Sequence, residues 1–318
     1  MKATQGTTYR MLGSRLDDVT RRLEELRNIG ATGKKLNKPS DNPASIRPVL
    51  STRKQISNVD RYLETMNTSL DRMQATDSYL DHVENIMQRA KEIAINAGDG
   101  SLNTDDRASL ADALKNLREE LADTANGMVD DKYLFAGFNN QIIPFVENPA
   151  FDPVLYDRTD ASTWPYTYQG DGNHIMQEIS PGEMIQTNLT GAELFTGDAD
   201  MDGSVDGGKV DLFAVLALTE NAIRTGDNTA LQTQMDQLDQ AAEQNRRLRS
   251  QMGNRAARVD EAIRHQEHVR VDLKQILSRY EDADALESFT EITKQETAYQ
   301  AALSITGKVS KLTILDFI

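Results

Sequence analysis

The sequence contains no cysteine, few aromatic residues and no apolar run longer than Leu212–Leu218, and each shortage excludes a class of protein. Without cysteine the chain forms neither disulfides nor thiolate metal sites. An aromatic share of 6% in 318 residues favours packed helices over a thick β-sandwich. The apolar runs are too short for a transmembrane helix, so we expect no membrane insertion. The first residues also lack the apolar core of a cleaved secretory signal, so secretion would need another route.

Proline occurs only between Pro39 and Pro181, and this distribution predicts long helices on both sides of an irregular middle. We expect Gly30 and Gly33 to end the first helix, and Asn42 or Ser45 to cap the next one. Aromatic residues and glycine turns between 133 and 190 are typical of short strands. The sequence therefore predicts a small β-rich domain inserted between helices.

Both ends of the chain carry an apolar stripe with helical spacing. The stripe recurs every three or four residues, so it occupies one face of a helix. Such a helix cannot bury its apolar edge alone, and we predict that the two ends pair with each other and with neighbouring copies, becoming ordered on assembly. The predicted assembly interface consists of Leu12, Leu16, Val19, Leu23, Leu26, Phe289, Ile292, Tyr299, Leu303, Val309, Leu312 and Leu315.

These patterns predict a mostly α fold, in which both chain ends build an elongated antiparallel helical rod or coiled coil with an inserted small β-rich domain. We expect five parts along the chain. They are an N-terminal helix and loop that pair with the C-terminus (1–45), an outgoing helical rod (46–135), the inserted β-rich domain (136–208), a returning helical rod (209–281) and the C-terminal helix of the inner coiled coil (282–318).

Charge is distributed unevenly over the chain. The net charge of -15 disfavours nucleic acid and anionic membrane surfaces as partners. Residues 1–60 hold twelve Lys or Arg against six Asp or Glu, whereas residues 140–210 hold two against twelve. The middle of the chain is therefore expected to present an acidic, solvated surface.

One acidic segment has the spacing of a calcium-binding loop. Alternate oxygen-bearing side chains and a central glycine match the first nine positions of such a loop, and these candidate ligands are Asp198, Asp200, Asp202, Ser204 and Asp206. Position twelve is Lys209 in place of the usual bidentate acid, so we expect the calcium affinity to fall unless Asp211 or Glu193 acts as a substitute. The alternative is an acidic surface loop whose Asp and Gly residues favour turns.

Four segments resemble the flagellin superfamily. The segment Thr32–Ser45 reads Thr-Gly-Lys-Lys-Leu-Asn-Lys-Pro-Ser-Asp-Asn-Pro-Ala-Ser and resembles the loop that follows the first helix of that superfamily. The residues that carry this loop motif are Gly33, Lys34, Asn37, Pro39, Ser40, Asp41 and Pro43. Three further stretches resemble its hook-filament junction branch, hook-associated protein 3: 126–137 with Tyr-Leu-Phe-Ala-Gly at 133–137, the Gly-Ala-Glu-Leu-Phe of 191–195, and the C-terminal 299–318. Asn42 departs from the acidic residue usual at its position.

This resemblance implies a structural component of the bacterial flagellum, an adapter ring that joins the hook, through hook-associated protein 1, to the flagellin filament. It also implies self-assembly, an export chaperone as a partner, and secretion to the extracellular flagellum by flagellar type III export. Two alternatives remain: flagellin itself, as the filament subunit, or a non-flagellar coiled-coil interaction module. No nucleophile elbow, phosphate loop or zinc-enzyme motif is present, so we expect no enzymatic activity and no catalytic residue.

Overall fold

The computed structural model describes residues 2–98 and 102–315, and α-helices dominate them, which confirms the predicted mostly α class. The helices are α1 (Lys2–Thr32), α2 (Pro43–Ala97), α3 (Thr104–Ala125), α4 (Leu212–Thr225), α5 (Asn228–Glu281) and α6 (Ala285–Leu315). The strands are β1 (Met128–Val129), β2 (Lys132–Tyr133), β3 (Phe145–Glu147), β4 (Tyr166–Tyr168), β5 (Met176–Ser180) and β6 (Glu183–Gln186). Short helical turns η1 (Ala161–Thr163) and η2 (Ala192–Thr196) complete the insert.

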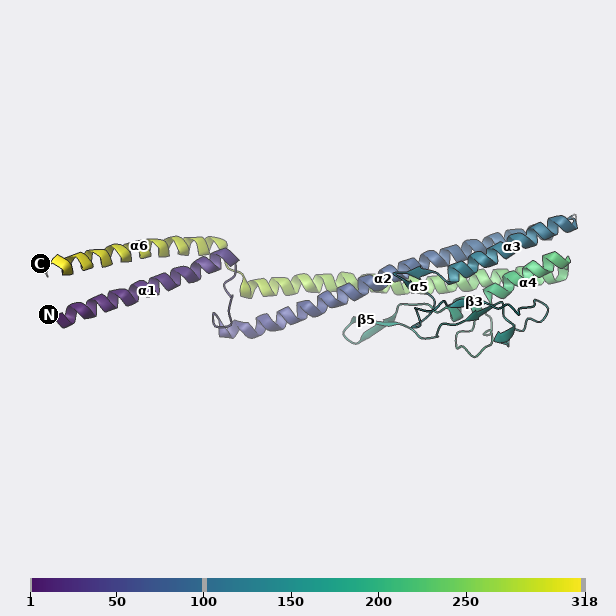
Figure 1. Cartoon of the computed structure of the whole chain (residues 1–318), viewed down its shortest axis with the longest axis horizontal. Helices are drawn as coiled ribbons and strands as arrows, with labels where there is room; N and C mark the ends of the chain where they lie inside the picture. The colour runs from purple at the N-terminus through teal and green to yellow at the C-terminus, as the bar shows by residue number, and fades with distance from the viewer. Residues whose placement is uncertain (1, 99–101, 316–318) are drawn as a thin grey trace. The chain divides into compact units, whose positions relative to one another are not determined.

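The chain forms two compact units, each built from segments far apart in the sequence (Figure 1). Unit 1 comprises residues 1–60 and 268–318, and therefore contains α1, the start of α2, the end of α5 and α6. Unit 2 comprises residues 61–267 and contains the remaining helices and every strand of the described residues.

In unit 2, α2 and α5 share a core of residues at heptad spacing. The side-chain amide of Asn245 donates to the carbonyl oxygen of Leu80 at 2.9 Å, which joins the two helices inside that core. At its edge the Arg249 guanidinium pairs with the Asp77 carboxylate at 2.8 Å. The buried apolar residues of this seam include Leu63, Met66, Met73, Leu80, Leu238, Met252, Val259 and Ile263. The heptad spacing of both segments thus serves the protein's own core.

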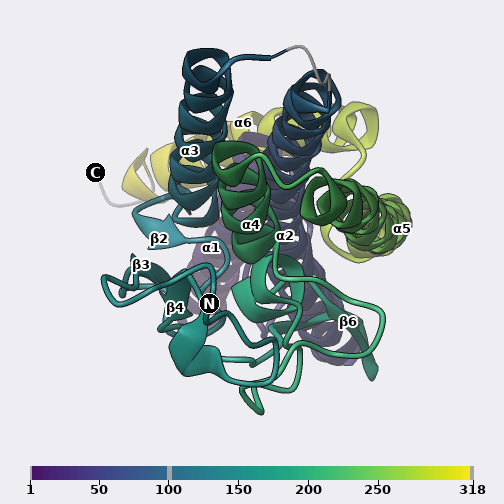
Figure 2. The same cartoon turned by 90° about the vertical axis from the view of Figure 1, so that its right-hand side faces the viewer.

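Helices α3 and α4 pack against each other beside this pair (Figure 2). The buried side chains of α3 fall at helical spacing and include Leu114, Leu117 and Leu121. The Arg118–Glu220 ion pair spans α3 and α4 at 3.0 Å with both side chains largely shielded. Helix α4 is apolar over most of its length, because it is enclosed by neighbours on several sides.

The strands lie between α3 and α4 in the sequence and form three separate two-stranded antiparallel sheets. This confirms the predicted small β-rich insert. β1 pairs with β2, β3 with β4, and β5 with β6, the last pair carrying an irregularity between Glu178 and Ser180. Figures 1 and 2 both show the β3–β4 and β5–β6 pairs along one side of the unit 2 helices. No sheet of the described chain exceeds two strands, so side chains from the helices must supply much of the insert's core.

One predicted helix end is wrong. Gly30 does not end α1, which continues to Thr32; it instead lies so close to α6 that an added Cβ would meet Ile292 Cδ1 at 2.9 Å. Gly33 does end the helix, with a left-handed φ of 67° that glycine adopts without strain. The absence of a side chain at Gly30 therefore allows α1 and α6 to pack closely.

None of the described helices is both long and apolar enough to cross a membrane.

Candidate functional site

The predicted interface residues on α1 form the face that pairs with α6 in unit 1. Leu23 is buried, and the other four residues, Leu12, Leu16, Val19 and Leu26, are half-buried. The two antiparallel helices meet at an exposed ion pair between Arg27 and Glu296 at 2.8 Å and at the close approach of Gly30 to Ile292. The α1 stripe is thus used within the chain, and its shielding is incomplete.

The predicted interface residues on α6 fall into two groups. Ile292 and Tyr299 are half-buried, Ile292 against Gly30 of α1, whereas Phe289 and Leu303 are 65% and 44% exposed. Leu286 adds a 79% exposed side chain near Phe289 on the same helix. Helix α6 therefore presents apolar surface that α1 does not cover. Val309, Leu312 and Leu315 belong to the part of α6 whose side chains lie outside the described residues.

The loop between α1 and α2 joins the two ends of the chain. The backbone N–H of Lys35 donates to the carbonyl oxygen of Glu281 at 2.7 Å, and the N–H of Ala283 donates to the carbonyl oxygen of Gly33 at 2.9 Å. These two bonds create an isolated antiparallel bridge between Lys34 and Asp282. The loop is consequently held to the segment between α5 and α6 by main-chain bonds.

Several loop-motif residues have a structural role in the loop itself. The Asp41 carboxylate accepts hydrogen bonds from the backbone N–H groups of Asn37 at 2.9 Å and Lys38 at 2.7 Å, which closes a tight turn. Asn42 then accepts from the N–H of Ala44 at 3.1 Å and so caps α2. Pro43 is the first residue of α2, where a missing N–H costs no helical hydrogen bond. Pro39 and Ser40 are exposed parts of this turn.

Glu281 is a functional candidate that the sequence patterns do not reveal. Its carboxylate is 2% exposed, accepts from Lys34 Nζ at 3.2 Å and pairs with Arg53 at 2.6 Å. A buried carboxylate is tolerated when cations and hydrogen bonds compensate for lost water. The one available signal was its place at the C-terminal end of a helix, where an acid is unfavourable without a compensating partner. Glu281 links the loop, α2 and α5 of unit 1.

Two segments that carry the family resemblance meet in an aromatic cluster at the base of the insert. The rings of Phe135 and Phe195 lie 5.2 Å apart in an edge-to-face arrangement. The backbone N–H of Gly191 donates to the carbonyl oxygen of Phe135 at 2.7 Å, and a Cβ at Gly191 would lie 2.7 Å from the Phe145 ring. Phe213 of α4 packs on Phe195 and Phe145, so the cluster anchors the insert to the helices.

Gly137 closes the first of these segments for a specific reason. Its φ is 69°, and an added Cβ would lie 2.2 Å from the Asp171 carboxylate. That carboxylate accepts from the backbone N–H groups of Phe138 and Asn173 at 3.0 and 2.9 Å. Partial burial raises the pKa of Asp171, but the backbone hydrogen bonds together hold it below the usual range. The ionised side chain thus organises two loops of the insert.

The structure brings three of the five predicted calcium ligands together. One carboxylate oxygen from each of Asp198, Asp200 and Asp202 lies within 4.8 Å of the other two. Asp206 instead pairs with Lys209 at 2.9 Å. Ser204 and Asp202 bond to each other, their hydroxyl and carboxylate oxygens 2.8 Å apart.

Neither predicted substitute completes this loop. Asp211 caps α4, its carboxylate accepting from the N–H groups of Phe213 and Ala214, and Glu193 lies in η2, outside the three-carboxylate cluster. Burial is the largest influence on the Asp198 carboxyl and raises its pKa. Calcium binding remains a prediction, and calorimetric titration that gives no heat at millimolar calcium would exclude it.

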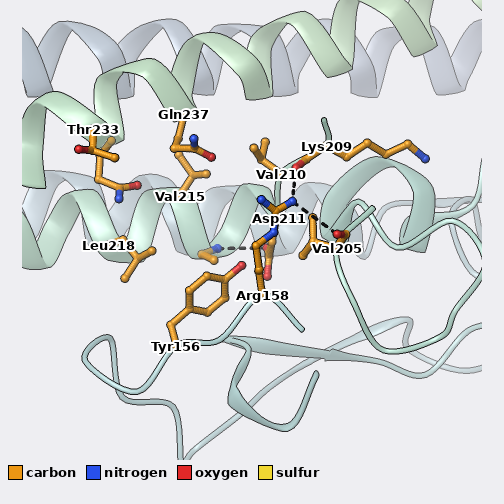
Figure 3. Close-up of a pocket in the computed structure, with 12 residues that line it drawn as sticks. Tyr156, Arg158, Val205, Lys209, Val210, Asp211, Val215, Leu218, Thr233 and Gln237 are labelled. Carbon is orange, nitrogen blue, oxygen red and sulfur yellow. Dashed lines mark hydrogen bonds between the residues drawn. The ribbon is translucent and has the colours of Figure 1, made fainter. Parts of the chain in front are cut away.

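A cavity of about 220 Å³ lies where the insert meets α4 and α5 (Figure 3). Tyr156, Arg158 and Asp211 line it, but Arg158 is occupied by the carbonyl oxygens of Val205, Asp206 and Lys209. Burial raises the pKa of Asp211 to about 7, against the effect of the two α4 amides. The Arg158 guanidinium and the Asp211 carboxyl are thus both committed to local structure.

The helical ends of the chain match known family models. Residues 4–140 match the bacterial flagellin N-terminal helical region, and residues 235–318 match the bacterial flagellin C-terminal helical region. The chain belongs to the flagellin superfamily. Members of this family are structural proteins, and this chain is accordingly a structural protein and not an enzyme.

The relatives place the chain on one branch of that superfamily. Flagellar hook-associated protein 3 of Salmonella typhimurium is 26% identical over 259 residues, which cover 78% of this chain and 75% of that protein. Hook-associated protein 3 of Escherichia coli is 28% identical over 61% of this chain and 58% of that protein, so the match omits more than a third of the latter. A putative flagellar hook-associated protein from Vibrio parahaemolyticus shares the fold, with a TM-score of 0.64 at 15% identity over 76% of this chain and 100% of that chain. The resemblance to hook-associated protein 3 is confirmed.

Proposed function

We propose that this protein forms an adapter ring between the flagellar hook and the flagellin filament, on the extracellular side of the cell. Its direct neighbours in this proposal are further copies of itself, hook-associated protein 1 and flagellin. It reaches the assembly site by flagellar type III export with the help of an export chaperone. Membership of the flagellin superfamily thus becomes a specific position in the flagellum.

The observation that carries the proposal is the uncovered apolar surface of the terminal helix pair. Pairing with α1 leaves Leu286, Phe289 and Leu303 of α6 exposed, at 79%, 65% and 44%. Burial of one large apolar side chain contributes about 1.5 to 3 kcal/mol of stabilising free energy, which an exposed side chain lacks. Burial of this surface between subunits supplies a driving force for assembly.

The α1–α2 loop supports the same proposal. Its main-chain bridge and the Glu281 ion pairs hold the N-terminal and C-terminal segments together in unit 1. A pair of helices that is fixed at its base can enter an assembly as one element, because less conformational entropy is lost on binding. The loop motif thereby positions the helices whose surfaces make the proposed contacts.

A gene deletion tests the proposed position in the flagellum. A junction role predicts that deletion removes the filament while flagellin accumulates as monomer in the medium, and that the intact gene restores attached filaments. Cell-attached filaments in the deletion strain would contradict the proposal. If the protein were the filament subunit itself, deletion would abolish the filament without releasing another flagellin, and the protein would dominate sheared filaments by mass.

A further inference from the structure

The first turns of α2 carry an exposed face that is both apolar and basic. Arg47, Leu50 and Lys54, here called the basic stripe, are spaced so that they share one face of the helix. Leu50 is 57% exposed. Between residues 43 and 59 the chain has three cations and no acid, and Arg53 is occupied by Glu281. Among the described residues, Arg47 and Lys54 have no ion-pair or hydrogen-bond partner.

The turn between β1 and β2 has the complementary chemistry. Met128, Asp130 and Asp131, here called the acidic tip, are all exposed, and Met128 is 43% exposed. Both aspartates adopt left-handed φ values, 52° and 58°, in a two-residue turn that Asn or Gly usually fills. The charge of Asp130 acts to raise the pKa of Arg72, and burial of Arg72 lowers it more strongly. Neither the Asp130 nor the Asp131 carboxylate is hydrogen-bonded to a described residue.

A second exposed apolar loop in the insert is less suited to a basic partner. Val154 and Leu155 are 80% and 68% exposed, and acids flank them. However, the Asp152 carboxylate accepts from the N–H of Val154 at 2.9 Å, and the Asp157 carboxylate accepts from Thr159 at 2.8 Å. Those acids stabilise their own turns. The two carboxylates of the acidic tip, by contrast, make no hydrogen bond that holds their own turn among the described residues.

The charge of the two units favours a second copy as the partner. Unit 1 holds 18 Lys or Arg against 14 Asp or Glu, a net +4, whereas unit 2 holds 17 against 36, a net -19. The basic stripe belongs to unit 1 and the acidic tip to unit 2. A closed ring requires a heterologous contact, in which two different surfaces of the same chain meet between neighbours. Oppositely charged surfaces on the two units satisfy that requirement.

We propose that the basic stripe of one copy docks on the acidic tip of a neighbouring copy, with Leu50 against Met128 and the two cations beside the two carboxylates. An apolar centre with charged residues at the rim is the usual anatomy of a protein interface. The proposal rests on the proposed ring function and names one of its contacts.

Thiol crosslinking tests this contact directly, because the natural chain has no cysteine. A Ser51→Cys/Lys132→Cys double variant places one thiol next to each surface without altering the six contact residues. Flagella with attached hooks are treated with a short thiol-specific crosslinker and denatured. Contact between neighbours predicts a ladder of dimers and higher multimers. The two single-cysteine variants should give no ladder. The same holds for a Ser51→Cys/Asp236→Cys control, in which the second thiol lies on an exposed site of α5.

Charge variants then test the chemistry of the contact. In the crosslinkable background, Lys54→Gln should lower the multimer yield several-fold, and Asp130→Asn/Asp131→Asn should do the same while keeping residues that suit the turn. The combined variant should lose little more than either alone, because groups in one interaction are not additive. The yield should also fall with added salt.

The outcomes separate this contact from the ring function itself. Flagella that contain the double-cysteine protein at the junction but give only monomer would overturn the contact and leave the ring function intact. A crosslink within one chain, or to a different protein, would overturn it as well. Absence of the protein from flagella that are otherwise complete would overturn both proposals.

Discussion

At the scale of single residues, Glu281 shows how one buried charge can organise a chain junction. Its carboxylate is shielded, while its two partners reach it from solvent, Lys34 being 45% and Arg53 52% exposed at the side chain. The desolvation cost therefore falls mainly on one ion. The same residue offers its backbone oxygen to Lys35, so main chain and side chain serve the same junction.

Replacement of this carboxylate should loosen unit 1. Glu281→Gln keeps the shape but removes the charge, and loss of the charge-assisted bonds should lower the free energy of unfolding of unit 1 by about 1 to 3 kcal/mol. Amide exchange at Lys35, whose N–H bonds to Glu281, should accelerate accordingly. Glu287→Gln, an exposed acid in the first turn of α6, is the matched control. Equal effects of both substitutions would contradict the role of Glu281.

Asp211 should make unit 2 less stable as the pH rises. Its pKa is raised to about 7 in the folded state by burial, so the folded protein holds a proton that the unfolded chain releases near pH 4. Stability contributed by this group is therefore present below pH 4 and lost as the pH rises toward 7. Asp211→Asn keeps a cap acceptor, and its stability relative to the natural protein should improve between pH 5 and pH 8, by at most roughly 3 kcal/mol.

Denaturant unfolding at the two pH values measures this difference. Asp227→Asn, at the exposed N-terminal cap of α5, gives the baseline for an Asp-to-Asn cap substitution. If the two variants shift equally with pH, the Asp211 carboxyl is not the source.

At the scale of elements, the insert depends on close packing at Gly191. An added methyl group would press on Phe145 at 2.7 Å and on Tyr168 at 2.8 Å. Gly191→Ala should therefore destabilise unit 2 by about 1 to 3 kcal/mol, as overpacking does. Near-ultraviolet circular dichroism during unfolding reports on these rings. Gly207→Ala, at a position with no atom near the added group, should leave the transition unchanged.

Two neighbouring positions on α6 should separate assembly from stability. Phe289 is exposed, so Phe289→Ala should change the free energy of unfolding by less than about 0.5 kcal/mol yet reduce the number of attached filaments. Ile292 contacts α1 at Gly30, so Ile292→Ala should loosen the α1–α6 pair. Thermal unfolding and filament counts measure the two effects. Normal filaments with Phe289→Ala would contradict an assembly surface there.

Regular elements were predictable from the sequence because their signals are local. Spacing of apolar residues predicted α2 and α5, and the turn-rich middle predicted the insert. Gly30 was misjudged because its reason, contact with Ile292, lies far along the chain. Glu281 and the aromatic cluster likewise depend on residues that only the fold brings together. The terminal stripe predicted helix pairing but could not show which α6 residues would remain exposed.

At the scale of the whole molecule, the two units should differ in local stability. Of the predicted interface residues on α1, only Leu23 is buried in the contact with α6. In unit 2, by contrast, α2 and α5 share a core of fully buried side chains. Segments with few buried apolar contacts open more readily. In a dilute monomer, amides of α1 and α6 should exchange far faster than those of α2 beyond residue 63. Mass-spectrometric hydrogen exchange measures this, and similar protection in both regions would refute assembly-dependent ordering of the termini.

The aromatic cluster that anchors the insert has an implication for engineering. Because Phe135, Phe195 and Phe213 fix where the insert leaves and rejoins the helices, the turn between β5 and β6 can change without moving those junctions. A Cβ at Gly182 in this turn would meet no atom within 4 Å, although its φ of 81° favours keeping the glycine itself. Foreign epitopes grafted beside this glycine would be displayed by every subunit while the helical interfaces kept their native sequence.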